Sequence, residues 1–277
     1  MKTNFYLGIG APRSGTTWLY NNLRNTSDLY LPPVKELRYF KGVRSAEEKQ
    51  SQAQKLLADA NLSPEDRSFV QHWQNTQDGQ DDAYLSLFPD KPKIGEVSPI
   101  YSILPPKRVK QIHDIVADLN PRVFYLLRNP FFRDISHVVF TLHRQRNVKT
   151  VHPVETYMEF VDRPLFQRRS DYSRNVKAWR GVFGDNLKLY FFDDMEKDPE
   201  GFFDKFCQEM DVSYSLEFFK EGRDNASGRD GRFLLEIPDP VLQHLRTRSE
   251  KLIAASRIVP SSYKQKWMDE ISAYFSA

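Results

Sequence analysis

The chain is 277 residues long and 40% hydrophobic, which allows either one large α/β domain or two smaller domains. Its 40 basic and 37 acidic residues leave a net charge of only +3, so a strong general affinity for nucleic acid is not implied. We expect the short basic runs at residues 144–149 and 168–169 to be solvated surface.

The first predicted elements are a strand, a glycine-bounded loop and a helix. An apolar run over residues 5–9 predicts the strand, and apolar residues at Trp18, Leu19 and Leu23 predict the helix. Between them, residues 10–17 read Gly-Ala-Pro-Arg-Ser-Gly-Thr-Thr. Such a loop can direct several backbone N–H groups and the positive end of the helix dipole at one small anion, such as a phosphate.

This loop departs from an ATP-binding P-loop at one position. The spacing of Gly10 and Gly15 matches a P-loop, but Thr16 stands where the phosphate-binding lysine belongs. Arg13 supplies a cation from inside the loop instead. We interpret the stretch as a phosphate-binding loop without the usual nucleotide triphosphatase chemistry. The alternative is that the two glycines only make a tight turn, with Arg13 solvated outside it.

Between residues 29 and 119, the sequence predicts three helices and one short strand. The prolines within residues 29–33 require an extended path. Two polar-faced helices are predicted at residues 45–61 and 63–75. They are followed by a short strand ending in a turn at residues 93–99 and by a helix at residues 106–119.

The rest of the chain alternates strands with helices. A nearly unbroken apolar run over residues 122–127 is typical of a parallel strand covered on both faces. The other predicted elements are a helix from Pro130 through Ser136 towards His143, helices at residues 153–162 and 170–183, a strand at residues 188–192, and helices after Pro199, after Pro240 and near Tyr263. The alternation predicts an α/β fold, P-loop-like and three-layered, with helices on both faces of a central, mainly parallel sheet. Because no linker-like stretch divides it, we expect residues 1–277 to form a single domain.

The single cysteine, Cys207, bears on the cellular compartment. It lies in a helical-looking segment beside Phe203 and Phe206, so we expect a buried small hydrophobe rather than a metal ligand or a nucleophile. A lone cysteine favours a reducing, cytoplasmic location. No run approaches about 18 apolar residues and the first strand begins almost at the N-terminus, so we expect a soluble protein with neither a transmembrane segment nor a cleavable signal.

Three stretches directly follow predicted strands, where open parallel sheets bind their ligands. They are the loop at residues 10–17, the turn at residues 96–99 and Arg128. Ser136 lies about two helical turns after Arg128, so its hydroxyl and the guanidinium can share an anionic group. The plainer alternatives are a surface salt bridge for Arg128 and a helix-interior hydroxyl for Ser136.

Several of these stretches together resemble one enzyme family. The sequence from Gly10 to Trp18 resembles the 5′-phosphosulfate loop of sulfotransferases that use 3′-phosphoadenosine 5′-phosphosulfate (PAPS). Residues 127–136 resemble their 3′-phosphate motif, with an Arg and a Ser at the same interval. Residues 35–40, Lys-Glu-Leu-Arg-Tyr-Phe, are similar to the segment with the catalytic glutamate in the heparan sulfate N- and 3-O-sulfotransferase branch. The similarity extends from Gly8 to about residue 245.

The resemblance implies a donor site for PAPS. The residues that would grip its 5′-phosphosulfate are Arg13, Ser14, Gly15, Thr16 and Thr17. Arg128 and Ser136 would bind the 3′-phosphate, and Gly231 with Arg232, which resemble a late cofactor-binding loop, would close over the donor. Trp18 either contacts the adenosine or packs the helix.

The roles of Arg13 and Lys35 at this donor site remain open. Most relatives have Lys where this chain has Arg13, and the rigid fork of Arg is a different donor from an ammonium group. The role of Arg13 at the leaving group is therefore open, although the resemblance implies that it is catalytic. Lys35, next to the implied base, is a candidate for assisting it.

The resemblance implies Glu36 as the general base. The motif that carries a His in cytosolic sulfotransferases of small phenols and steroids corresponds here to residues 96–99, which include no His. The alternative for Glu36 is a solvated carboxylate paired with Lys35 or Arg38. We expect His137 and His143 to be packing or surface residues.

The implied reaction is an in-line transfer of sulfonate from PAPS to a hydroxyl or amine of an acceptor, with 3′,5′-ADP as the product. No metal is expected, because no cluster of His, Cys or Asp has suitable spacing. The acceptor, a glycan, a lipid or a small alcohol, is not specified by a donor site. We expect residues 42–91 and 144–169 to shape its cleft.

Two other classes of function remain open. A P-loop small-molecule kinase requires Lys at position 16, which is missing, and an acidic magnesium ligand after a strand, for which Asp193 and Asp194 are the candidates. A non-catalytic nucleotide-binding module would bind 3′,5′-ADP without transferring sulfonate. Nothing in the sequence specifies the oligomeric state.

Overall fold

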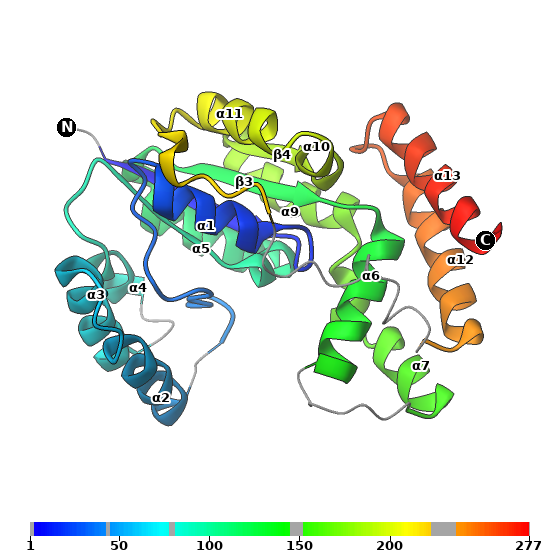
Figure 1. Cartoon of the computed structure of the whole chain (residues 1–277), viewed down its shortest axis with the longest axis horizontal. Coiled ribbons are helices and arrows are strands. Elements are labelled where there is room, and N and C mark those ends of the chain that lie inside the picture. Colours follow the sequence, from blue (N-terminus) through cyan, green and yellow to red (C-terminus); the bar gives the residue numbers. More distant parts are fainter. Residues whose placement is uncertain (1–2, 43–44, 78–80, 145–151, 223–236, 277) are drawn as a thin grey trace.

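The centre of the molecule is a sheet of four parallel strands in the order β2-β1-β3-β4 (Figure 1). The computed structural model describes residues 3–42, 45–77, 81–144, 152–222 and 237–276. The strands are β1 (Asn4–Gly10), β2 (Lys93–Val97), β3 (Arg122–Leu127) and β4 (Leu187–Phe191). The predicted α/β fold with a central parallel sheet is therefore confirmed.

Alternate residues of each strand enter two different cores, one on each face of the sheet. Leu7 and Tyr125 belong to a core that includes α5 (Pro106–Val116) and α9 (Tyr172–Phe183). Tyr6 and Phe124 belong to a second core with α1 (Thr16–Thr26) and α11 (Pro199–Met210). Because successive strand side chains point to opposite faces, this division places one pair of helices on each side of the sheet. The predicted three layers are present.

Cys207 lies in the second of these cores. Its side chain is fully buried beside Phe203 and Phe206, and burial raises the pKa of the thiol to about 12. A thiol that remains protonated at neutral pH is a poor nucleophile. The prediction of a buried small hydrophobe is confirmed.

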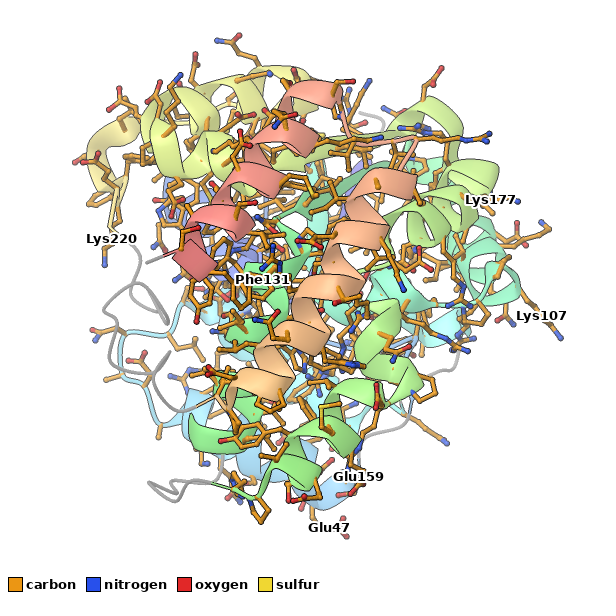
Figure 2. All side chains as sticks on the ribbon, turned by 90° about the vertical axis from the view of Figure 1, so that its right-hand side faces the viewer. Glu47, Lys107, Phe131, Glu159, Lys177 and Lys220 are labelled. Atoms are coloured by element: carbon orange, nitrogen blue, oxygen red, sulfur yellow. The ribbon has the colours of Figure 1, made fainter. Side chains whose placement is uncertain are left out.

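The remaining helices extend the molecule at both ends of the sheet (Figure 1). They are α2 (Ala46–Leu57), α3 (Pro64–Asn75), α4 (Asp81–Tyr84), α6 (Pro130–Val138), α7 (Val154–Asp162), α8 (Pro164–Arg168), α10 (Phe192–Lys197), α12 (Asp239–Ala255) and α13 (Ser261–Ser276). Helices α6, α7, α12 and α13 gather beyond the carboxyl end of β3 (Figure 1). Figure 2 looks onto this side, where Phe131 packs against the rings of Tyr274 and Phe275 from α13.

Three predicted boundaries differ from the structure. The helix expected to reach residue 61 ends at Leu57, and the helix after Pro130 changes into a π-helical stretch from Val139 to Arg144. The last strand ends at Phe191, because Phe192 already begins α10. None of the helices in the described ranges is long and apolar enough to cross a membrane.

Candidate active site

The loop between β1 and α1 lies at the carboxyl edge of the sheet, as predicted. Its backbone is held by the N–H of Ala11, which donates to the carbonyl of Leu126 in β3 at 2.8 Å. Arg13 and Gly15 have φ angles of 70° and 83°, and these left-handed residues turn the chain into the helix. Gly15 is the N-cap of α1, and no side chain caps the first turn in the described structure. The positive end of the helix therefore faces the loop.

Gly15 is favoured by its left-handed conformation, and it also lies close to two side chains beneath the loop. A Cβ at this position would lie 2.2 Å from Cε of Met195 and 3.2 Å from a ring carbon of Phe192. Both residues belong to α10, which begins directly after β4. The start of α10 thus lies directly beneath the loop.

A buried hydroxyl inside the loop has a vacant hydrogen-bonding position. Ser14 is fully buried, and its Oγ has no hydrogen-bond partner within the described part of the chain. Buried hydroxyls in proteins are nearly always hydrogen-bonded. Together with the uncapped N-terminus of α1, this hydroxyl fits an anionic group held at the loop.

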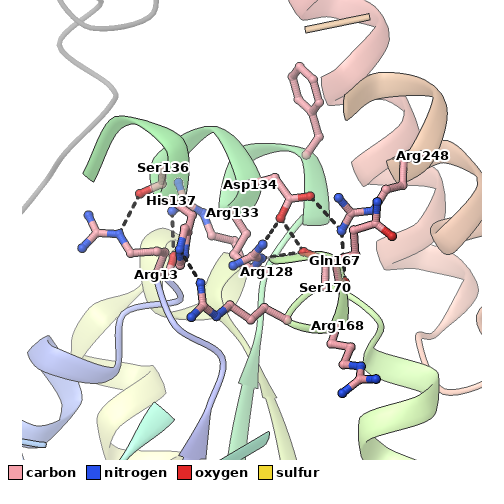
Figure 3. A network of polar contacts seen from close by, with 12 residues as sticks. Arg13, Arg128, Arg133, Asp134, Ser136, His137, Gln167, Arg168, Ser170 and Arg248 are labelled. Carbon is pink, nitrogen blue, oxygen red and sulfur yellow. Dashed lines mark hydrogen bonds and ion pairs between the residues drawn. The ribbon is translucent and has the colours of Figure 1, made fainter. Parts of the chain in front are cut away.

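The structure brings Arg128 and Ser136 to the same loop, as expected from the pairing of β1 with β3. Arg128 follows β3, and its Nη1 donates to the carbonyl of Arg13 at 2.9 Å. Ser136 lies on α6, and its Oγ accepts from Nε of Arg13 at 3.1 Å (Figure 3). The two sequence segments assigned to opposite ends of one nucleotide therefore meet at Arg13.

Aromatic rings contact both guanidinium groups, and a hydroxyl holds the backbone of Arg128. The guanidinium carbon of Arg128 lies 4.3 Å from the ring centre of Phe192, and that of Arg13 lies 4.5 Å from the ring centre of Phe140. Such cation–π contacts contribute roughly 0.5–1 kcal/mol at exposed sites. Tyr172 donates its hydroxyl to the carbonyl of Arg128 at 2.8 Å, which fixes the end of β3.

Glu36 lies on the segment between α1 and α2, and about a quarter of its side chain is exposed. Its Oε2 accepts from Nε of Arg38 at 3.1 Å, so the ion pair weighed as an alternative does exist. Because Arg38 is more than half exposed, this pair is worth at most about 1 kcal/mol. Pairing with Arg38 and service as a base are therefore compatible.

Lys35, beside Glu36, has a strongly perturbed pKa. Burial lowers the pKa of its ammonium group to about 8, an effect that the Glu36 carboxylate opposes and the Arg38 guanidinium reinforces. The Nζ atom lies 5.7 Å from the ring centre of Tyr20. A lysine with this pKa is partly neutral near physiological pH, which is compatible with proton transfer.

Arg169 was expected to be solvated, and this expectation is wrong. Arg168 is exposed, but Arg169 is partly buried and contacts Nε2 of His137. Burial lowers the pKa of Arg169, with a further lowering by Arg38 and an opposing effect of the Glu36 carboxylate. Arg169 is therefore close enough to Glu36 for their charges to interact. The sequence carries no signal for this proximity, because it depends on how α8 packs against α6.

His137 is a packing residue, as predicted. Its ring stacks on Phe160 with 5.8 Å between the ring centres. Burial lowers the pKa of His137 well below its usual value, and the nearby cations Arg169, Arg133 and Arg13 lower it further. The imidazole is therefore neutral at physiological pH.

A buried polar cluster, which the sequence did not predict, holds α6 in position. Arg133 and Asp134 are both fully buried and form an ion pair (Figure 3). The Asp134 carboxylate also accepts from the hydroxyl of Ser170 at 2.6 Å and pairs with Arg248 of α12 at 3.3 Å. Ser136 is also on α6, so this cluster fixes the orientation of the helix that presents Ser136 to Arg13.

The remaining residues that the sequence predicted for the donor site are Gly231, Arg232, Trp18, Thr16 and Thr17. Gly231 and Arg232 lie outside the described residues. Trp18 is a packing residue, because its Nε1 donates to the carbonyl of Lys220 at 2.8 Å and its ring contacts Phe203. Thr16 is buried and Thr17 is exposed in the first turn of α1.

The carboxylates considered as magnesium ligands of a kinase are used elsewhere. Asp193 accepts from Nε1 of Trp267 at 3.0 Å and pairs with Lys266 at 2.6 Å. Asp194 accepts from the hydroxyl of Tyr263 at 2.6 Å. These contacts attach α10 to α13. Among the described residues, no three His, Cys, Asp or Glu side chains gather as a metal site.

Comparison with known proteins identifies similar chains. A model of the sulfotransferase family matches residues 7–215, whereas no curated protein sequence matches the chain. A sulfotransferase structure from Alicyclobacillus acidocaldarius is similar with a TM-score of 0.54 and 22% sequence identity, covering 92% of this chain and 97% of its own. A sulfotransferase domain from the curacin biosynthetic pathway is similar with a TM-score of 0.53 and 18% identity, covering 98% of each chain. At these identities the solved structures indicate a shared fold.

Proposed function

Because the chain belongs to the sulfotransferase family, we propose that it transfers the sulfonate group of PAPS to a hydroxyl or amine of an acceptor. The observation that carries the proposal is the meeting of Arg128, Arg13 and Ser136 at one loop. A donor with phosphates at both its 3′ and 5′ positions requires two anion sites at a fixed separation. An ordinary adenine nucleotide needs only one of them.

The residues of the loop are suited to the 5′-phosphosulfate. The buried Ser14 hydroxyl and the uncapped N-terminus of α1 offer donors for it, and Arg128 with Ser136 would hold the 3′-phosphate. When bound, PAPS supplies an activated sulfonate whose leaving group is 3′,5′-ADP. Arg13 would stabilise the negative charge that grows on the leaving phosphate.

Glu36 would act as the general base. About a quarter of its side chain is exposed, and an acceptor hydroxyl or amine that reaches the carboxylate would lose its proton to it during the attack. The neighbouring Lys35, with a pKa near 8, would balance the charge of this carboxylate. The similarity of residues 35–40 to the heparan sulfate N- and 3-O-sulfotransferase branch makes glycans the first acceptors to test, followed by lipids and small alcohols.

The proposal is tested with radiolabelled PAPS against a panel of glycans, lipids and small alcohols. Once an acceptor is found, Glu36→Gln should lower turnover by about 10²- to 10⁴-fold, the range for loss of a general base. Because the donor loop is unchanged, the Kd for 3′,5′-ADP should stay within about threefold of wild type.

Glu65→Gln is the matched control. Glu65 is another partly exposed carboxylate in an ion pair, with Lys91 at 2.6 Å, and it should leave turnover unchanged. Near-normal turnover of Glu36→Gln would exclude Glu36 as the base. Binding of 3′,5′-ADP without transfer to any acceptor would instead favour a non-catalytic module.

A further inference from the structure

A buried carboxylate lies beneath the segment that carries Glu36. Glu96 is the fourth residue of β2 and is 1% exposed. Its carboxylate accepts hydrogen bonds from three hydroxyls, those of Tyr84, of Ser98 at 2.6 Å and of Tyr101 at 3.0 Å. Burial of a carboxylate costs several kcal/mol unless donors of this kind compensate it. A buried carboxylate in a core of aromatic rings therefore points to a specific role for Glu96.

Two of these hydroxyls also hold the backbone after Glu36. The Ser98 hydroxyl accepts from the backbone N–H of Arg38 at 3.0 Å, and the Tyr101 hydroxyl accepts from the backbone N–H of Phe40 at 3.4 Å. A hydroxyl has one proton and two lone pairs. Because each proton is donated to Glu96, the lone pairs of both oxygens remain available to the two amides.

We propose that Glu96 is a positioning residue that orients Ser98 and Tyr101 so that they hold the Glu36 segment at a fixed place beside the donor loop. The inference rests on the proposed role of Glu36 as the base. A carboxylate is suited to this task because it only accepts hydrogen bonds, which sets the direction of every bond in the relay. A glutamine would add an N–H₂ donor, and the hydroxyl facing it would have to turn its proton elsewhere.

The turn that follows β2 also contacts the donor loop. A Cβ placed on Gly10 would lie 2.8 Å from the carbonyl oxygen of Pro99 and 3.0 Å from Oγ of Ser102. The loop and the turn are therefore in close contact at the start of the loop. The turn thus contacts the donor loop on one side and, through Ser98 and Tyr101, holds the Glu36 segment on the other. This arrangement sets the distance between the base and the donor.

The first test is the turnover of Glu96→Gln and Ser98→Ala. Displacement of a catalytic group by about 1 Å can cost on the order of 10²-fold in rate, so turnover should fall about 10- to 100-fold in both variants. The Kd for 3′,5′-ADP should stay within about threefold of wild type. Ser249→Ala is the matched control, because Ser249 is equally buried but lies on α12, and its Oγ has no hydrogen-bond partner among the described residues. It should keep wild-type turnover.

A second readout does not depend on catalysis. Hydrogen–deuterium exchange at the Arg38 amide should be faster in Glu96→Gln and Ser98→Ala than in wild type or Ser249→Ala, while exchange in residues 16–26 of α1 should not change. If Glu96→Gln fails to fold, turnover and hydrogen–deuterium exchange can be measured in Ser98→Ala and Tyr101→Phe instead. Wild-type turnover in these variants would overturn the inference, and so would unchanged exchange of the Arg38 amide in Ser98→Ala or of the Phe40 amide in Tyr101→Phe.

A double variant separates the proposed role of Glu96 from the proposed role of Glu36. In a Glu36→Gln background, adding Ser98→Ala should lower the residual rate no further, because both changes act through the same carboxylate. A full, independent loss would show that Ser98 acts elsewhere and would overturn the relay. If Glu36→Gln itself keeps turnover, the proposed base is wrong, whatever the behaviour of Glu96.

Discussion

Arg128→Gln is the substitution that most directly tests how the donor is recognised. Hydrogen bonds to charged groups contribute about 1.5–3 kcal/mol, which corresponds to roughly a 10- to 150-fold change in Kd at 1.36 kcal/mol per tenfold step. If Arg128 binds the 3′-phosphate, its loss should weaken 3′,5′-ADP by this factor. Its side chain also holds the Arg13 carbonyl at 2.9 Å, so some loss should be common to every nucleotide bound at the loop.

The ratio of two affinities separates these effects. Calorimetry should measure the Kd of 3′,5′-ADP and of 5′-AMP for wild type and for Arg128→Gln. The common loss cancels in the ratio, so the preference for 3′,5′-ADP should fall about 10- to 150-fold. Arg174→Gln, at an exposed arginine on α9, should change neither Kd. An unchanged ratio in Arg128→Gln would refute the assignment of the 3′-phosphate to Arg128.

Two further predictions concern charge. Nuclear magnetic resonance of labelled lysine side chains should show Lys35 titrating near pH 8, well below its ordinary value of 10.5. Glu36→Gln should lower this pKa further and Arg38→Gln should raise it, because the carboxylate favours the ammonium form and the guanidinium disfavours it; shifts of the opposite sign would contradict the placement of these groups. Asp134→Asn leaves buried guanidinium groups without their carboxylate, so urea unfolding should show a loss of about 3–5 kcal/mol. In Asp114→Asn, which breaks a well-exposed pair with Lys110, the loss should be much smaller, because water screens exposed ion pairs; equal losses in the two variants would contradict the burial argument.

Much of the donor loop and most of the secondary structure were predictable because their signals are local. Short unbroken apolar runs predict strands, and apolar residues at a helical spacing predict helices, wherever they occur. Glycines at positions 10 and 15 around a cation define a turn before a helix. The interval of eight residues between Arg128 and Ser136 needs only one helix to become a spatial relation.

The contacts that complete the site needed the tertiary structure. Arg13 meets Ser136 because β1 and β3 pair in the sheet, and Trp18 meets Lys220, 202 positions away, because α1 packs beside the chain that follows α11. Arg169, expected in solvent, lies beside His137.

The amino-acid sequence by itself therefore determined the kind of loop, its cation and the order of strands and helices. Only the tertiary structure decided that Glu96 would lie under the Glu36 segment and that Asp134 would join α6 to α12. The physical reason is that periodicity and turn chemistry act over a few residues, whereas a buried charge finds its partners only when distant segments pack together and exclude water.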